Sequence, residues 1–189
     1  VFHQTPILHN ELINREKLST SAVMGSLNLI MRIFNSSEKE NLGMEAHPAE
    51  YGIYLSLVKK NKLHIKTKDG YQFVKPAKDN VGLHQLFNLF NDYLKKKKEP
   101  VSLQELFNIF SAQPYGVKTG ILPLLVSLFY KINEGSFALY NVDESGRESL
   151  ITEHAKQVAE RFYQWPEAIK IMHVKIEGEK QEGLDSCKN

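Results

Sequence analysis

One pattern occurs twice in the sequence: an apolar helical segment followed by a short hairpin. The first copy runs through PAEYGIYLSLVKKNKL and HIKTKDGYQFVKP (48–76), and the second through VKTGILPLLVSLFYKIN and EGSFALYNVDESGRESLI (117–151). Each copy follows amphipathic helical segments, and it repeats the pattern without repeating the residues. The sequence therefore predicts a mainly α fold with small β-hairpins (α+β), built as tandem winged-helix-like units that pack through their apolar helices.

The repeat also sets the predicted boundaries. Residues 1–78 form the first winged-helix-like unit with a basic hairpin, and residues 79–151 form the second. A C-terminal helix and strand (152–178) pack on the two units, and residues 179–189 form a flexible tail because they contain few apolar side chains. A chain of 189 residues is long enough for two small units that share a buried seam.

The composition bears on where the protein is located in the cell. No apolar run reaches the roughly 20 residues that a membrane-spanning helix needs. The single cysteine, Cys187, has no partner for a disulfide, which favours a cytoplasmic protein. Because the chain begins at Val1 in what looks like the middle of a sequence, we expect it to be a piece of a longer polypeptide.

Local signals place the elements of the first unit. Apolar residues at helical spacing predict a helix over 19–36, with Ser19 or Thr20 as its N-cap. Pro48 suits the first turn of the next helix, which ends near Asn61. The pair Asp69-Gly70 predicts a tight turn between two short strands.

The second unit carries equally clear signals. A helix is predicted over 83–94, and Ser102 with Glu105 forms a capping box at the start of the next helix. Pro123 requires the following helix to begin near Thr119 or Gly120. A last helix over 155–162 and a terminal strand over 169–177 complete the chain.

The helix that would read bases in the second unit, ILPLLVSLFYKI, is apolar almost all round. It offers only Ser127 and Lys131 to a base edge, whereas base-reading helices present several polar side chains to the major groove. A helix that is hydrophobic on every side is usually buried, so we expect it to form core or a seam between the units. Docking onto another domain is the functional alternative.

The first hairpin is the candidate nucleic-acid surface. Lysines cluster around it with Asp69 as the only acid, and Tyr71 and Phe73 lie among them. Lysines on a hairpin can neutralise phosphates without reading sequence. The alternative is a solvated hairpin whose lysines protect an exposed strand edge. The residues assigned to the nucleic-acid surface are Lys59, Lys60, Lys62, Lys66, Lys68 and Lys75.

No motif for catalysis, a cofactor or a metal is recognisable. The glycines of Gly116-Val117-Lys118-Thr119-Gly120 lack the spacing of a phosphate-binding loop, and the seven histidines lack zinc-site spacing. The chain as given is therefore expected to be neither an enzyme nor a cofactor-binding protein.

Near the N-terminus, the segment NELINR can form a capped helical turn with an ion pair. On a helix Glu11 and Arg15 would pair at i, i+4, and Asn10 could cap that helix. One interpretation is local capping and pairing. The other is a contact with a missing part of the polypeptide, made by Asn10, Glu11, Asn14 and Arg15.

Four segments together carry a family resemblance: NELINREKLS (10–19), LGMEAHPAEYGIYLSLV (42–58), QPYGVKTGILPLLVSLF (113–129) and FALYN (137–141). In these segments the chain resembles the C-terminal region of large prokaryotic P-loop ATPases of the defence and restriction type. The resemblance implies that ATPase machinery lies upstream of Val1 and that this chain is an accessory region that packs on it.

These observations lead to two functional hypotheses. The first is a non-catalytic winged-helix interaction module of a larger ATPase, which packs on its parent protein and binds nucleic-acid backbone, such as that of DNA, without sequence specificity. The second is a pure protein–protein interaction scaffold in which every lysine only aids solubility.

Overall fold

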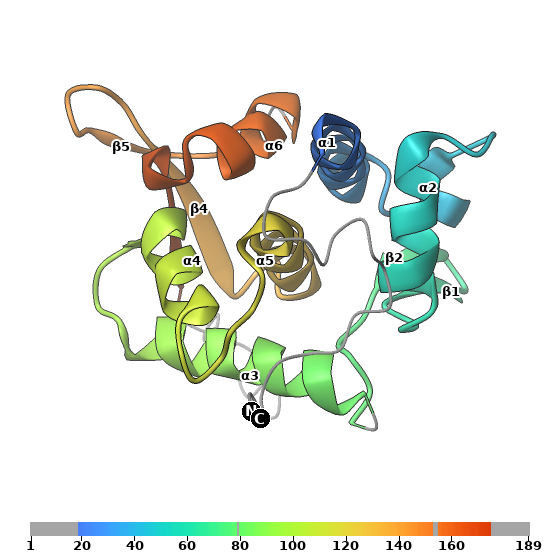
Figure 1. The fold of residues 1–189 in the computed structure, drawn as a ribbon, viewed down its shortest axis with the longest axis horizontal. Coiled ribbons are helices and arrows are strands. Elements are labelled where there is room, and N and C mark those ends of the chain that lie inside the picture. The colour runs from blue at the N-terminus through green and yellow to red at the C-terminus, as the bar shows by residue number, and fades with distance from the viewer. Residues whose placement is uncertain (1–18, 79, 153–154, 175–189) are drawn as a thin grey trace, which may run out of the picture.

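The computed structural model describes residues 19–78, 80–152 and 155–174. The residues proposed as a partner contact, Asn10, Glu11, Asn14 and Arg15, lie outside this part, as does the predicted tail over 179–189. Within it the fold is mixed α+β, with six α-helices and two small antiparallel sheets (Figure 1). The coarse fold class expected from the sequence is confirmed.

Helix α1 (Thr20–Asn35) confirms the first predicted helix. Ser19 caps it, because its hydroxyl oxygen accepts a hydrogen bond from the Ala22 amide at 3.3 Å. Its apolar side is buried against helices α2, α5 and α6. The helix therefore joins the first half of the chain to the second within one hydrophobic core.

The second helix is less regular than predicted. It begins as α2 (Ala49–Ile53), with Pro48 at the N-cap instead of inside the first turn, and continues as a π-helix, η2 (Tyr54–Lys59). In the wider turn the Lys60 amide donates to the Leu55 carbonyl at 2.9 Å. The chain then passes through Lys62, which has a left-handed φ of 52°, into the first hairpin.

Strands β1 (His64–Thr67) and β2 (Gly70–Phe73) form the predicted hairpin, but its turn is shifted by one residue. Thr67 pairs with Gly70, so Lys68 and Asp69 make the turn and Gly70 opens the second strand. Gly70 has a φ of +128°, and a Cβ there would lie 3.1 Å from the Glu38 carbonyl oxygen. Glycine is needed at this position for backbone conformation and for close approach.

The second hairpin belongs to a larger sheet. Strands β4 (Phe137–Val142) and β5 (Glu148–Leu150) pair as predicted, and β6 (Ile169–His173) pairs with the other edge of β4. The short strand β3 (Val101–Ser102) adds to β6, which gives the order β3-β6-β4-β5. The predicted terminal strand thus lies inside the sheet.

The helices of the second half surround an apolar centre. Helix α5 (Leu122–Ile132) lies in the middle of the molecule, with α1, α3 (Val81–Lys96), α4 (Leu103–Ser111) and α6 (Ala155–Gln164) around it (Figure 1). A 3-10 turn, η3 (Thr119–Ile121), precedes α5, so its N-cap is Ile121 and Pro123 falls in its first turn. Residues 122–129 are all buried, which confirms the prediction of a buried helix.

Over the residues described, none of the helices has the length and apolar character required to cross a membrane.

Candidate nucleic-acid interface

A buried histidine fixes the first hairpin to the body of the protein. His64 Nε2 lies 2.8 Å from the Ser37 carbonyl oxygen and donates to it, so Nδ1 accepts from the Tyr54 hydroxyl at 3.1 Å. Burial lowers the pKa of His64, and this effect outweighs the Ser37 carbonyl, which raises it. The imidazole is therefore held neutral, with its proton on Nε2.

Aromatic rings complete this attachment. The His64 ring stacks on Phe73 with centroids 4.7 Å apart and lies 5.3 Å from the ring of Tyr71. On the opposite face of the hairpin, Ile65 and its cross-strand partner Gln72 are exposed. The hairpin thus has one packed face and one face open to solvent.

All six lysines assigned to the nucleic-acid surface are exposed, but they form three groups. Lys59, Lys60 and Lys62 lie at the end of η2 and in the turn after it, at the base of the hairpin. Lys66 and Lys68 lie near its tip. The sixth, Lys75, lines a pocket on helix α3 together with residues of α3 and α5.

The hairpin has acidic neighbours that its own sequence does not reveal. The segment that carries Glu38 and Glu40 packs against β2, where the Tyr71 amide donates to the Glu38 carbonyl at 3.1 Å. The pKa of Tyr71 is raised by partial burial and by the adjacent Glu40 carboxylate. Asp69 is therefore not the only acid near the lysines. Only the tertiary fold brings this segment, some 30 residues earlier in the chain, to the hairpin.

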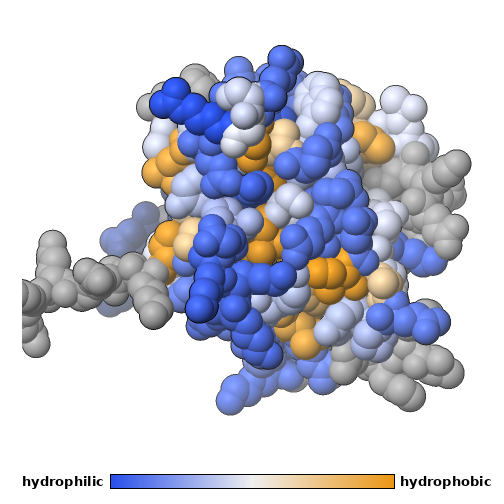
Figure 2. Space-filling view, turned by 90° about the vertical axis from the view of Figure 1, so that its left-hand side faces the viewer, coloured by the Kyte–Doolittle hydropathy of each residue, from blue (hydrophilic) through white to orange (hydrophobic). Residues whose placement is uncertain are grey.

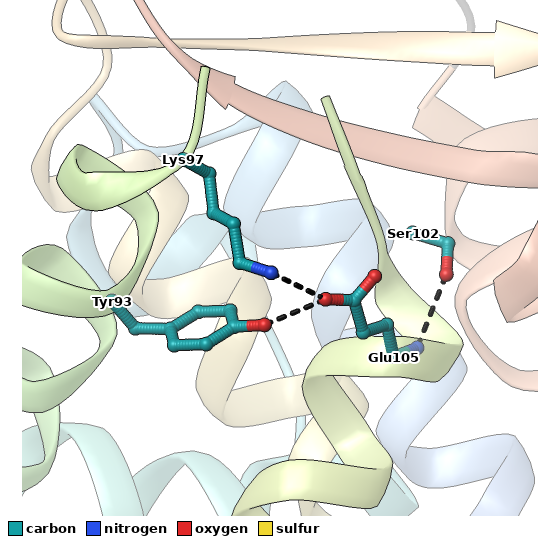
Figure 3. Close-up of polar contacts among 4 residues, drawn as sticks. All are labelled: Tyr93, Lys97, Ser102 and Glu105. Atoms are coloured by element: carbon teal, nitrogen blue, oxygen red, sulfur yellow. Dashed lines mark hydrogen bonds and ion pairs between the residues drawn. The ribbon is translucent and has the colours of Figure 1, made fainter. Parts of the chain in front are cut away.

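The Lys95–Lys98 run contains one lysine with a structural role. Lys97 Nζ and the Tyr93 hydroxyl both bond Glu105 Oε1, at 3.0 and 2.6 Å (Figure 3). These bonds, that of Tyr93 first, lower the pKa of Glu105. Ser102 caps α4 by accepting from the Glu105 amide at 3.1 Å, as the capping box predicted. The Glu105 side chain, however, links α4 to the end of α3 instead of turning back to Ser102.

Within the described residues, no group of three or more His, Cys, Asp or Glu side chains is placed to hold a metal ion.

Comparison of the chain with protein-family models, with curated proteins and with solved structures found no match.

Proposed function

We propose that this chain is a non-catalytic winged-helix-like interaction module that binds nucleic-acid backbone without reading sequence and packs on a larger parent protein. The order of elements supports the architectural part. From α3 the chain runs helix, short strand, helix, helix and strand pair, which is the succession a winged helix uses. Strand β6 then lies between β3 and β4, so the sheet is larger than a minimal wing.

The state of helix α5 supports the absence of base reading, and this observation carries the proposal. The two polar side chains that the sequence offered there are both bonded within the chain, Ser127 in the core and Lys131 at the surface. Ser127 is buried and donates to the Leu124 carbonyl at 2.8 Å, while Lys131 Nζ bonds Glu134 Oε2 at 2.6 Å. Over its buried length, residues 122–129, this helix has no free polar side chain to offer a base edge in the major groove.

The exposed lysines of the first hairpin supply the backbone contact. Lys66 and Lys68 project from a hairpin that His64 and the Glu38 carbonyl fix in place, so their positions are set before a ligand arrives. Lysines held on a fixed element bind phosphates at a lower entropic cost than lysines on a mobile loop. The parent protein proposed is an upstream ATPase region of the same polypeptide, as the family resemblance implies.

The test is duplex DNA binding across a salt series. Changing Lys66 and Lys68 together to Glu should weaken binding at low salt. It should also flatten the plot of log K against log salt by up to about 1.8, since each phosphate contact contributes roughly 0.9. The double variant Lys96→Glu/Lys98→Glu is the matched control, because it makes the same charge change at the end of α3. Absence of binding, or equal slopes for both variants, would exclude the hairpin as the interface.

A protein-interaction scaffold is the second candidate, and one surface observation favours it. Leu150 and Trp165 are 55% and 51% exposed, on strand β5 and just after helix α6. Figure 2 looks onto the side of the molecule that carries β5 and the end of α6, where hydrophobic patches alternate with hydrophilic residues. The test is a pull-down of the proposed upstream ATPase segment by this chain at high salt. Retention by the wild type, with loss of retention in Trp165→Ser, would support the scaffold function instead.

A further inference from the structure

A pocket on helix α3 combines Lys75, one of the six lysines of the candidate surface, with side chains of α3 and α5. Three segments line it: helix α3, the residues that follow the first hairpin, and the C-terminal end of α5. Its volume is about 110 Å³. This is somewhat below the size of a cavity that accepts benzene, so an open pocket of this kind can seat one compact group. The lining residues are Lys75, Pro76, His84, Phe87, Asn88, Asn91, Lys95, Phe129 and Asn133.

The polar wall of the pocket comes from one stripe of α3. His84, Asn88, Asn91 and Lys95 follow one another at steps of four, three and four residues, which places them along one side of the helix. The stripe spans about 16 Å, from the rise of 1.5 Å per residue. Lys75 reaches the same pocket from the segment after β2. Ligand groups can therefore meet cations from two different segments.

The floor of the pocket is apolar and rigid. Phe87 and Phe129 are 5% and 1% exposed, and their rings meet edge to face with centroids 5.8 Å apart. Pro76 is also buried. This floor fixes the polar wall, because α3 cannot shift relative to α5 without disrupting the packing.

The hydrogen bonds and charges of the wall favour an anion. The Asn88 amide nitrogen donates to His84 Nδ1 at 2.9 Å, which leaves the ring proton on Nε2 as a donor. The Asn133 amide is held by a bond to the Phe129 carbonyl at 2.8 Å. The wall combines two lysines with imidazole and amide donors, and the described residues that line the pocket include no acidic side chain.

We propose that this pocket is a binding site for a phosphate group carried by a nucleotide or by a nucleic-acid strand. A phosphate offers several acceptor oxygens to donors that surround it, and here the lysines supply the charge while the amides and imidazole supply the remaining donors. This site goes beyond the interface proposed above, because it requires neither Lys66 nor Lys68.

The primary test is an NMR titration of the 15N-labelled 189-residue chain with inorganic phosphate at constant ionic strength. The wild type should give saturable shifts of the amides around Asn88, Asn91 and Asn133. Lys95→Glu should weaken the affinity at least tenfold, whereas Lys96→Glu, with the same charge change one residue outside the pocket, should leave it within twofold. Equal weakening by both variants, or shifts that do not saturate, would overturn the site.

Two further ligands identify the source of the phosphate. Adenosine monophosphate and a 5′-phosphorylated hexanucleotide are titrated in the same way. Tighter binding of the hexanucleotide assigns the site to a nucleic-acid strand, and equal or tighter binding of the mononucleotide assigns it to a free nucleotide. The variant Lys66→Glu/Lys68→Glu should keep the wild-type affinity for inorganic phosphate. A tenfold loss of phosphate affinity in that variant would contradict a pocket that is separate from the hairpin. If the variant loses only duplex binding, the hairpin interface is supported and the pocket is unaffected.

Discussion

The two hairpins arise from one sequence pattern but are held in place by different physics. The β1-β2 hairpin is a separate two-stranded sheet, attached through a buried neutral histidine, aromatic rings and a backbone bond to the Glu38 carbonyl. Isolated two-stranded hairpins are only marginally stable, so this attachment determines whether the hairpin stays ordered. Strands β4 and β5 instead belong to a four-stranded sheet, and β4 covers the apolar core.

This difference separates a half that forms core from a half that exposes a basic surface. In the second half, the helix before the hairpin is buried from Leu122 to Phe129, and the Ser127 hydroxyl within it donates to the Leu124 carbonyl. In the first half, one face of the hairpin and all six lysines of the candidate surface are exposed to solvent. The same local pattern therefore builds core in one half of the chain and an accessible basic surface in the other.

The largest effect is expected from the aromatic core beneath the second hairpin. Phe129 is 1% exposed, and its ring packs edge to face on those of Phe87, Phe90 and Phe137. Phe129→Ala should lower the free energy of unfolding by about 3–5 kcal/mol, through lost burial and a residual cavity. Urea denaturation followed by circular dichroism measures this change. As the control, Leu150→Ala on the exposed strand β5 should cost less than about 0.5 kcal/mol; similar costs for both would contradict a core centred on α5.

A smaller effect is expected from the ion pair that joins α1 to α2. Arg32 Nε donates to Glu50 Oε1 at 2.9 Å, and the Glu50 side chain is only 4% exposed. Arg32→Ala leaves this carboxylate buried without its partner and should lower the free energy of unfolding by about 3 kcal/mol. This is the low end for a buried pair, because the Arg32 side chain is 33% exposed. Urea denaturation of the double variant Arg32→Met/Glu50→Met is the control. It should regain much of the loss, and a double variant less stable than Arg32→Ala would contradict the argument.

Local signals in the sequence predicted most elements, because helix caps and apolar periodicity act over a few residues. Ser19 and Ser102 cap the helices they were expected to cap, and α5 is buried as its composition required. The one-residue shift of the first turn shows where such signals are weaker. Asp69-Gly70 indicated a turn, but Gly70 pairs with Thr67 and opens β2, where it lies close to the Glu38 carbonyl.

Contacts between distant segments could not be predicted. No local pattern indicates that β6 inserts beside β4, or that Glu105 bonds Tyr93 and Lys97 instead of completing its capping box. The α3 pocket is a further example, because Lys75 and Asn133 meet the α3 stripe only through tertiary packing. The sequence indicated that the six lysines of the candidate surface are exposed, and they are. It could not predict that they divide into three groups.

A modest loss of stability is expected in the first hairpin, and only there, as the pH falls from 7 to 5. Burial lowers the pKa of His64, so the unfolded chain binds a proton more readily than the folded one. Stability from this site is complete above the unfolded pKa of about 6.5 and falls as the pH drops towards the lowered folded pKa, by at most about 1.4 kcal/mol per pH unit. Amide exchange of Tyr71 and Val74, followed between pH 7 and pH 5, measures this loss of hairpin stability. In His64→Gln this pH dependence should disappear, and its persistence would assign the effect to another group.

The smallest effect concerns the turn of the second hairpin, at lower pH. Asp143 Oδ1 accepts from the Ser145 hydroxyl at 2.6 Å and from the amides of Ser145 and Arg147 at 2.9 and 3.0 Å. These bonds, that of the Ser145 hydroxyl first, lower the pKa of the carboxyl. The turn is therefore fully ordered above the unfolded pKa of about 3.9 and loosens as the pH falls through the lower folded pKa.

Amide exchange of Gly146 and Arg147 measures this loosening. Asp143→Ala should raise both exchange rates at neutral pH, while the amides of Tyr71 and Val74 stay unchanged. Asp143→Asn is the matched control, because its side-chain oxygen can still accept from the backbone amides but no longer titrates. Its exchange rates should lie between those of the wild type and Asp143→Ala. If acid loosens the second turn before the first hairpin, the two hairpins are not held by the groups named here, and the contrast between them fails.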